Sequence, residues 1–272
     1  MKPNAIFFLL LLPIVFTNVS GQTDVVTLDG NYQGRNLYIQ NPFTDGTAGF
    51  CVTEILVNGN PTKDEIQSSA FEIDFKTLDL KLGDPVEVKI KHKTGCKPRV
   101  LNPEVLKPKA TFELSDIKLS ADGLLEWSTK NESGKLNFIV EQFRWNKWLK
   151  VGEVEGKGTP GTNNYTFKAS PHSGKNQVRV KQIDYTNQPK TSRAAEASTS
   201  ICNIEFGPVK TAAEINFTCS DNKSAIETLF EVYDQYGNIV KKGFGSKVNV
   251  ADLKKGMYYL NYDNKMGEFT RK

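Results

Sequence analysis

Cysteine and histidine are the residues of this 272-residue chain that could bridge strands, bind metals or catalyse. The four cysteines are Cys51, Cys96, Cys202 and Cys219. An even number favours disulfide bonds in an exported chain. Because bonded cysteines usually lie in one domain, we expect the pairs Cys51–Cys96 and Cys202–Cys219, with four buried free thiols as the alternative. No C-x-x-C or cysteine–histidine spacing indicates zinc, so we expect no metal site.

The two histidines, His92 and His172, would have to supply the general base of any serine or cysteine mechanism that uses imidazole. His172 lies in Ser-Pro-His-Ser-Gly, which predicts a turn, and His92 lies between two lysines, which predicts an exposed strand position. No G-x-S-x-G, H-E-x-x-H, phosphate-loop or dinucleotide motif occurs. We therefore expect a protein that is not an enzyme and that uses no cofactor and no small-molecule substrate.

Aromatic and basic residues gather at one predicted turn. Trp145 and Trp148 alternate there with Arg144 and Lys147. Tryptophan and arginine are enriched where proteins contact one another. This cluster therefore predicts an exposed contact patch.

The segments that position these residues have the pattern of β-strands. Val86, Val88 and Ile90 fall on one face of an extended run, and charged residues fall on the other. Asn58-Gly59 is typical of a tight hairpin turn. Such short strands recur every 8–12 residues or so, and helical periodicity is scarce. The chain is therefore predicted to be all-β, with three consecutive small β-sandwich domains.

Two irregular segments divide the chain. Residues 102–109 contain two prolines and no periodicity, which predicts a linker, and residues 192–200 are small and polar. The predicted domains are 22–105, 106–200 and 201–272. The net charge of +4 is too small to suggest a nucleic-acid partner.

The N-terminus predicts export. Lys2 precedes an apolar run over residues 6–16, and Val19 and Gly21 are small enough for a cleavage site. A spanning helix needs about 20 apolar residues, so this run is too short for a membrane anchor. Residues 1–21 are therefore predicted to be a signal peptide, and we expect no direct membrane insertion.

The middle segment resembles a fibronectin type III domain in the order of its apolar strands, at residues 124–127, 138–142, 148–152, 165–167 and 177–184. This resemblance implies that Trp127 is the core tryptophan of an early strand and that Phe138 and Val140 point inward. Val178, Val180 and Ile183 would belong to a late strand. The spacing from Val180 to Ile183 predicts a break in its alternation.

The last segment contains a turn followed by a patterned strand pair. Asp234, Gly237 and Val240 form D-x-x-G-x-x-V, and a second run matches I-x-V-x-x-L-x-x-G-x-Y through Val248, Val250, Leu253, Gly256 and Tyr258. This segment resembles the type A C-terminal sorting domain of the bacterial type IX secretion system. Gly237 would supply the turn, and Leu253 and Tyr258 would pack the sandwich. The segment departs from the family at residues 202–208, where a Pro-Asn-Pro start is usual.

As a whole the chain resembles the plug subunits that close the periplasmic mouth of the type IX translocon. The similarity rests on size, the absence of a lipid anchor, residues 41–51 and the sorting-like tail. It implies a non-enzymatic periplasmic protein associated with the outer membrane, with a large outer-membrane β-barrel as partner. The candidate partner-binding residues are Trp145, Trp148, Asp234, Gly237 and Tyr258.

Two other hypotheses remain open. In the first, the chain is a cell-surface or secreted binding or adhesion protein, exported by means of its C-terminal sorting domain. In the second, it is a conventional eukaryotic secreted protein, consistent with N-x-S/T sequons at Asn131, Asn164, Asn216 and Asn222.

Overall fold

The structure is a computed structural model that describes residues 23–44 and 49–272, so the predicted signal peptide at residues 1–21 lies outside the described residues. Within these ranges the regular elements are β-strands and two short 3-10 helices. The all-β prediction is therefore confirmed. No helix in the described part of the chain has the length and apolar character needed to span a bilayer.

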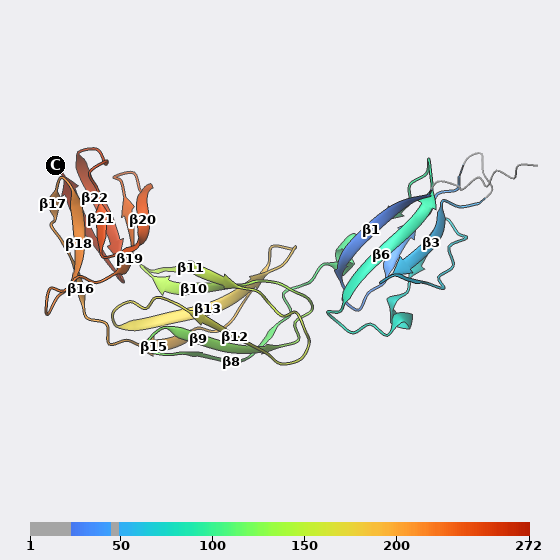
Figure 1. Ribbon diagram of the computed structural model, residues 1–272, viewed down its shortest axis with the longest axis horizontal. Coiled ribbons are helices and arrows are strands. Elements are labelled where there is room, and N and C mark those ends of the chain that lie inside the picture. The colour runs from blue at the N-terminus through green and yellow to red at the C-terminus, as the bar shows by residue number, and fades with distance from the viewer. Residues whose placement is uncertain (1–22, 45–48) are drawn as a thin grey trace, which may run out of the picture. The chain divides into compact units, whose positions relative to one another are not determined.

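The first group of strands forms two sheets within residues 23–100. One sheet has the order β1 (Thr23–Asn31), β6 (Pro85–Lys93), β3 (Val52–Val57) and β4 (Asn60–Pro61). The other has the order β5 (Ala70–Ile73), β2 (Leu37–Gln40) and β7 (Arg99–Val100). Strands β1 and β6 run side by side in Figure 1. Val86, Val88 and Ile90 are buried, as the alternation of the sequence predicts.

Local turn chemistry explains the shape of this region. Asn58 and Gly59 both have positive φ, 50° and 80°, which the hairpin from β3 to β4 requires. A 3-10 helix, η1 (Phe75–Leu78), begins after Asp74, whose carboxylate accepts a hydrogen bond from the Lys76 amide. The predicted linker at 102–109 contains a second 3-10 helix, η2 (Pro103–Leu106). Its apolar residues Val105 and Leu106 are buried, so this segment is a packed connection.

The middle strands form two layers. One is β12 (Asn163–Lys168), β9 (Leu124–Lys130) and β8 (Glu113–Leu119). The other is β11 (Lys147–Val154), β10 (Phe138–Arg144) and β13 (Lys175–Ile183), and β14 (Pro189–Thr191) and β15 (Ala195–Ser198) both pair with β13. Figure 1 shows β8, β9 and β12 opposite β10, β11 and β13.

Aromatic side chains fill the space between these layers. Trp127 stacks on Tyr165, with ring centroids 5.2 Å apart, and meets Phe138 edge-on at 5.7 Å. Trp127, Phe138 and Val140 are all buried, as the sequence pattern predicts. Offset and edge-on ring pairs of this kind stabilise a core beyond the burial of their area.

The predicted break in β13 is wrong. Its side chains alternate without interruption, so that Val178, Val180 and Gln182 point inward and Ile183 is exposed. Gln182 occupies an inward position because its side-chain amide donates to the Leu136 carbonyl, at 2.9 Å. A buried polar group is tolerated where it is hydrogen-bonded in this way.

The C-terminal strands also form two sheets. The smaller has the order β16 (Ile204–Gly207), β18 (Glu214–Cys219) and β21 (Lys247–Asn249). The larger has the order β17 (Lys210–Thr211), β23 (Lys265–Arg271), β22 (Gly256–Tyr262), β19 (Thr228–Tyr233) and β20 (Ile239–Gly245). Their core includes Phe217, Val232, Leu260 and Phe269.

The chain divides into two compact units that do not follow the predicted segments. Among the described residues, one unit comprises 23–28, 38–44, 49–73 and 87–101, and the other comprises 29–37, 74–86 and 102–272. The middle and C-terminal strands therefore belong to the same unit. The domain limits at 105 and 200 stay a prediction.

Candidate functional site

Two disulfides link the cysteines in the structure. Cys51 is joined to Cys96 and Cys202 to Cys219, with Cα–Cα distances of 5.9 and 5.6 Å. His92 lies close to the first pair, and its ring is buried instead of exposed as the sequence pattern predicts. The two clusters of potential metal ligands in the described part of the chain both contain a disulfide. Disulfide sulfurs offer no thiolate to a metal.

His172 does not form a catalytic arrangement with its neighbours. The predicted turn residue is buried, and burial lowers the pKa of its imidazole. Its Nδ1 lies 2.8 Å from the Ser173 carbonyl, and its Nε2 has no hydrogen-bond partner among the described residues. The Ser173 hydroxyl bonds to Asp263 instead of His172. The Ser173 hydroxyl is therefore not paired with the His172 imidazole.

Trp145 does not belong to an exposed contact patch, and that prediction is wrong. Its side chain is only 7% exposed. Its backbone amide donates to the Asn264 side chain at 3.1 Å, and its indole N–H points to the Tyr262 carbonyl at 3.5 Å. Both acceptors belong to the C-terminal strands. Trp145 is therefore covered by another part of the same chain.

Trp148 is half-buried on the outer face of β11. The Arg179 guanidinium stacks over its ring at 4.1 Å, and Phe143 meets the ring edge-on at 5.3 Å. Arg179 also binds Glu141, which accepts from Lys181. Although burial opposes ionisation, these two cations hold the pKa of Glu141 below its usual value. The cluster is a satisfied cation–π and ion-pair network.

Asp234 and Gly237 build an exposed turn. The Asp234 carboxylate accepts from the backbone amides of Tyr236 and Asn238, both at 2.9 Å. These bonds, with one from the Asn238 side chain, keep the pKa of Asp234 below its ordinary value. Gly237 has φ of 83°, a conformation that favours glycine. The Asp234 carboxylate and the Gly237 backbone are thus both committed to forming the turn.

Tyr258 is a core residue. Its ring stacks on Phe269 at 5.5 Å and its hydroxyl donates to the Lys254 carbonyl at 2.9 Å. The packing role proposed for Tyr258 is therefore confirmed. Its assignment as a partner-binding residue stays a prediction, and its side chain is buried in this structure.

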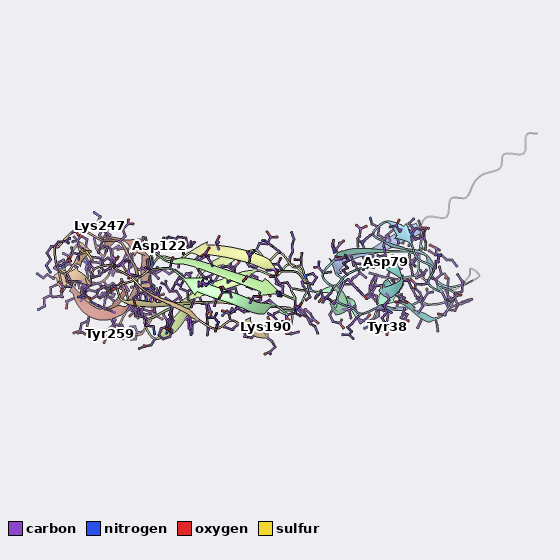
Figure 2. All side chains as sticks on the ribbon, turned by 90° about the horizontal axis from the view of Figure 1, so that it is seen from below. Tyr38, Asp79, Asp122, Lys190, Lys247 and Tyr259 are labelled. Carbon is purple, nitrogen blue, oxygen red and sulfur yellow. A yellow bond between two sulfur atoms is a disulfide. The ribbon has the colours of Figure 1, made fainter. Side chains whose placement is uncertain are left out.

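The accessible apolar residues of the C-terminal strands are different ones. Tyr259, labelled in Figure 2, follows Tyr258 on β22 and points to the opposite face, where it is 47% exposed. Other large apolar side chains are also exposed on the turns and strands of this region, namely Tyr236, Ile239, Phe244, Met257 and Met266. Period-two alternation from the buried Tyr258 and Leu260 could have identified Met257 and Tyr259.

Comparison with known proteins assigns the C-terminal region. A family model described as a secretion system C-terminal sorting domain matches residues 207–272. The match contains the Asp234 turn, the exposed apolar residues and strands β17 (Lys210–Thr211) to β23. No curated protein sequence matches the chain significantly.

Solved structures with partial similarity are built of β modules. The chicken CNTN1 FN1–FN3 domains are 13% identical, with 93% of this chain and 98% of that chain covered and a TM-score of 0.25. A segment of two fibronectin type III domains from chicken tenascin is 10% identical over 60% of this chain and 99% of that chain, with a TM-score of 0.20. These TM-scores are too low to bear on function.

Proposed function

We propose that this chain is a non-enzymatic binding protein exported by the type IX secretion system to the cell surface or the medium. The match of residues 207–272 to a secretion system C-terminal sorting domain is the observation that carries this proposal. The two groups of strands that precede this domain in the chain would be the cargo. They carry the binding function, and the C-terminal domain directs export.

Three features of the chain support this reading. Residues 1–21 have the sequence of a signal peptide, which would take the chain across the inner membrane. The four cysteines are joined in two disulfides, as suits an oxidising compartment. The Ser173 hydroxyl donates to the buried Asp263 carboxylate, and the His172 imidazole contacts the Ser173 backbone carbonyl.

The plug hypothesis makes a different prediction. A plug would stay in the periplasm, bound to a large outer-membrane β-barrel. The sorting-domain match supports export more directly than residence, since this domain type acts as an address. Of the residues named for plug contact, Trp145 and Tyr258 are buried and Asp234 and Gly237 form a turn.

Cell fractionation tests the proposal. The full chain and a chain that stops after Ser200 are expressed in a bacterium with a type IX system, and both are located by fractionation and surface labelling. We expect the full chain at the surface or in the medium and the shortened chain in the periplasm. Recovery of the full chain from the periplasm in complex with a large barrel would overturn the proposal in favour of the plug.

A further inference from the structure

Arg144 is a buried arginine, with only 1% of its surface exposed. It is the last residue of β10, next to the turn that leads into β11. Its Nη1 donates to the Asp263 carbonyl at 2.8 Å, and Asp263 lies in the turn between β22 and β23. An arginine of the middle sandwich is thus covered by a hairpin of the C-terminal one.

The guanidinium is held on several sides. Its Nε donates to the Gln142 side chain at 2.9 Å and its Nη2 donates to the Ser170 carbonyl at 2.6 Å. Burial lowers the pKa of Arg144 to about 10, which still leaves the group charged at neutral pH. A buried charge is tolerated only when its hydrogen-bonding groups are satisfied. Here one of the acceptors comes from the other sandwich.

The turn that contacts Arg144 is also fixed by hydrogen bonds. Asp263 has no exposed surface, and its carboxylate accepts from both the amide and the hydroxyl of Ser173. Its own amide donates to the Thr228 hydroxyl at 3.0 Å. Its φ of 51° is the left-handed conformation that tight hairpin turns use. The aspartate therefore joins the turn to the loop of the middle sandwich that contains Ser173.

A second set of bonds surrounds this centre. The Trp145 amide donates to Asn264, as described above. Lys147 donates to Glu231 at 2.8 Å and to the Tyr233 hydroxyl at 2.9 Å, and both belong to β19. The Lys147 ammonium also lies 5.6 Å from the Trp145 ring centre and 5.7 Å from that of Tyr233. An ion pair, hydrogen bonds and cation–π contacts therefore join the two sandwiches beside Arg144.

We propose that the end of the middle sandwich around Arg144 is a docking surface whose partner is the β22–β23 turn of the chain's own C-terminal domain. The two sandwiches then form one rigid body, and the C-terminal domain is presented to other proteins in a fixed orientation. Tyr262 and Asp263 of this turn are buried in this state, so an external receptor has to bind other residues of the domain. This docking can be measured without export, and its failure is distinguishable from failure of the proposed function.

The experiment cuts the connection after the chain has folded. A protease recognition sequence is inserted after Ser200, between β15 and β16, and the purified protein is cleaved. No disulfide crosses this point, since Cys202–Cys219 lies wholly on its C-terminal side. We expect the two pieces to co-elute in gel filtration. Separation of the wild-type pieces as two folded proteins would overturn the proposal.

Substitutions locate the contact. Arg144→Met is expected to raise the dissociation constant of the pieces by roughly 100-fold, because it leaves several buried acceptors unpaired. Arg179→Met is the matched control: this arginine contacts Glu141 and Trp148 within the middle sandwich, so the pieces should bind as in the wild type. Equal binding by the Arg144→Met and wild-type pieces would contradict the assignment.

A milder variant tests the same contact in case the Arg144→Met chain does not fold. Asn264→Ala changes an exposed turn residue and removes the acceptor of the Trp145 amide. We expect binding to weaken by about tenfold, the effect of leaving one buried donor unpaired. Circular dichroism of the uncut chain should be unchanged. If Asn264→Ala leaves binding intact, the β22–β23 turn is not the docked element.

Discussion

Trp145 and Tyr236 both lie in hairpin turns of this protein, and their side chains lie in opposite environments. Trp145 and Asn146 connect β10 to β11, with φ of 52° and 59°. The turn from Asp234 to Asn238 connects β19 to β20 and contains Tyr236. Trp145 is 7% exposed and Tyr236 is 80% exposed. The difference in exposure arises because the C-terminal strands cover the Trp145 turn, whereas the Asp234 turn is open to solvent.

Local chemistry is sufficient to explain the Asp234 turn. An aspartate accepts from the amides that follow it, and a glycine takes the positive φ. The Trp145 turn has neither a glycine nor an aspartate, and both of its central residues adopt positive φ. Non-glycine residues in this conformation store strain that the surrounding structure has to offset. Contacts with Tyr262 and Asn264 provide this compensation.

Replacing the two aromatic residues gives the largest expected contrast. Trp145→Ala should lower the free energy of unfolding by about 3–5 kcal/mol, the usual cost of truncating a buried tryptophan. Tyr236→Ala should change it by less than about 0.5 kcal/mol, as for other surface sites. Chemical denaturation followed by circular dichroism measures both. Equal losses for the two variants would show that Trp145 is not covered as described.

The glycine of the exposed turn should matter more than its aromatic residue. Gly237→Ala should destabilise by about 1–2 kcal/mol, because alanine is strained at a φ of 83°. Space is not the cause, since nothing lies within 4 Å of the position of an added Cβ. Gly161→Ala is a suitable control, because that site is equally open and does not have positive φ. A neutral Gly237→Ala variant would contradict the turn geometry.

Backbone strain at the buried turn can be separated from packing. Trp145→Gly and Trp145→Ala both remove the indole, but only glycine takes a φ of 52° without cost. We therefore expect the glycine variant to be the more stable of the two by about 1 kcal/mol. Their midpoints of thermal unfolding provide the comparison. The reverse order would mean that the turn relaxes once the side chain is gone.

The smallest expected effect is on pH dependence near the buried turn. Burial, with Arg144 nearby, lowers the folded-state pKa of His172 below its ordinary value of 6.5, although the Ser173 carbonyl and Asp263 oppose this shift. Stability from the neutral imidazole is therefore present above pH 6.5 and is lost as pH falls through the lower folded-state pKa. His172→Gln should flatten this part of the stability profile between pH 7.5 and about 5.5. If the free energy of unfolding of the wild type does not fall on acidification, this prediction is contradicted.

The strand pattern was predictable wherever alternation alone decides burial. Val86, Val88 and Ile90 are buried on β6, and Phe138 and Val140 on β10, because successive residues of a strand point to opposite faces. The same rule separates Tyr258 from Tyr259. Alternation also holds on β13, where Gln182 is buried and Ile183 is exposed. The expected break there was wrong because it followed the apolar character of Ile183, whereas the hydrogen-bonded Gln182 takes the inward position.

Contacts between segments far apart in the chain were not predictable. His92 and His172 are both buried, although their neighbours in sequence are lysines in one case and turn residues in the other. Trp145 has the composition of a surface patch and is covered by residues more than 100 positions away. Hydropathy describes whether a side chain prefers water or the protein interior. Whether these side chains are in fact covered depends on how sheets from distant parts of the chain pack together.

The amino-acid sequence by itself determined the all-β class, the tight turns at Asn58 and Gly237, and the aromatic core around Trp127, because each depends on period-two burial or on local backbone preference. It also indicated the sorting-like C-terminal pattern that the family match supports. The tertiary structure alone decided that Arg144 and Asp263 are buried against each other. A charged group can leave water only when distant parts of the chain bring its partners together.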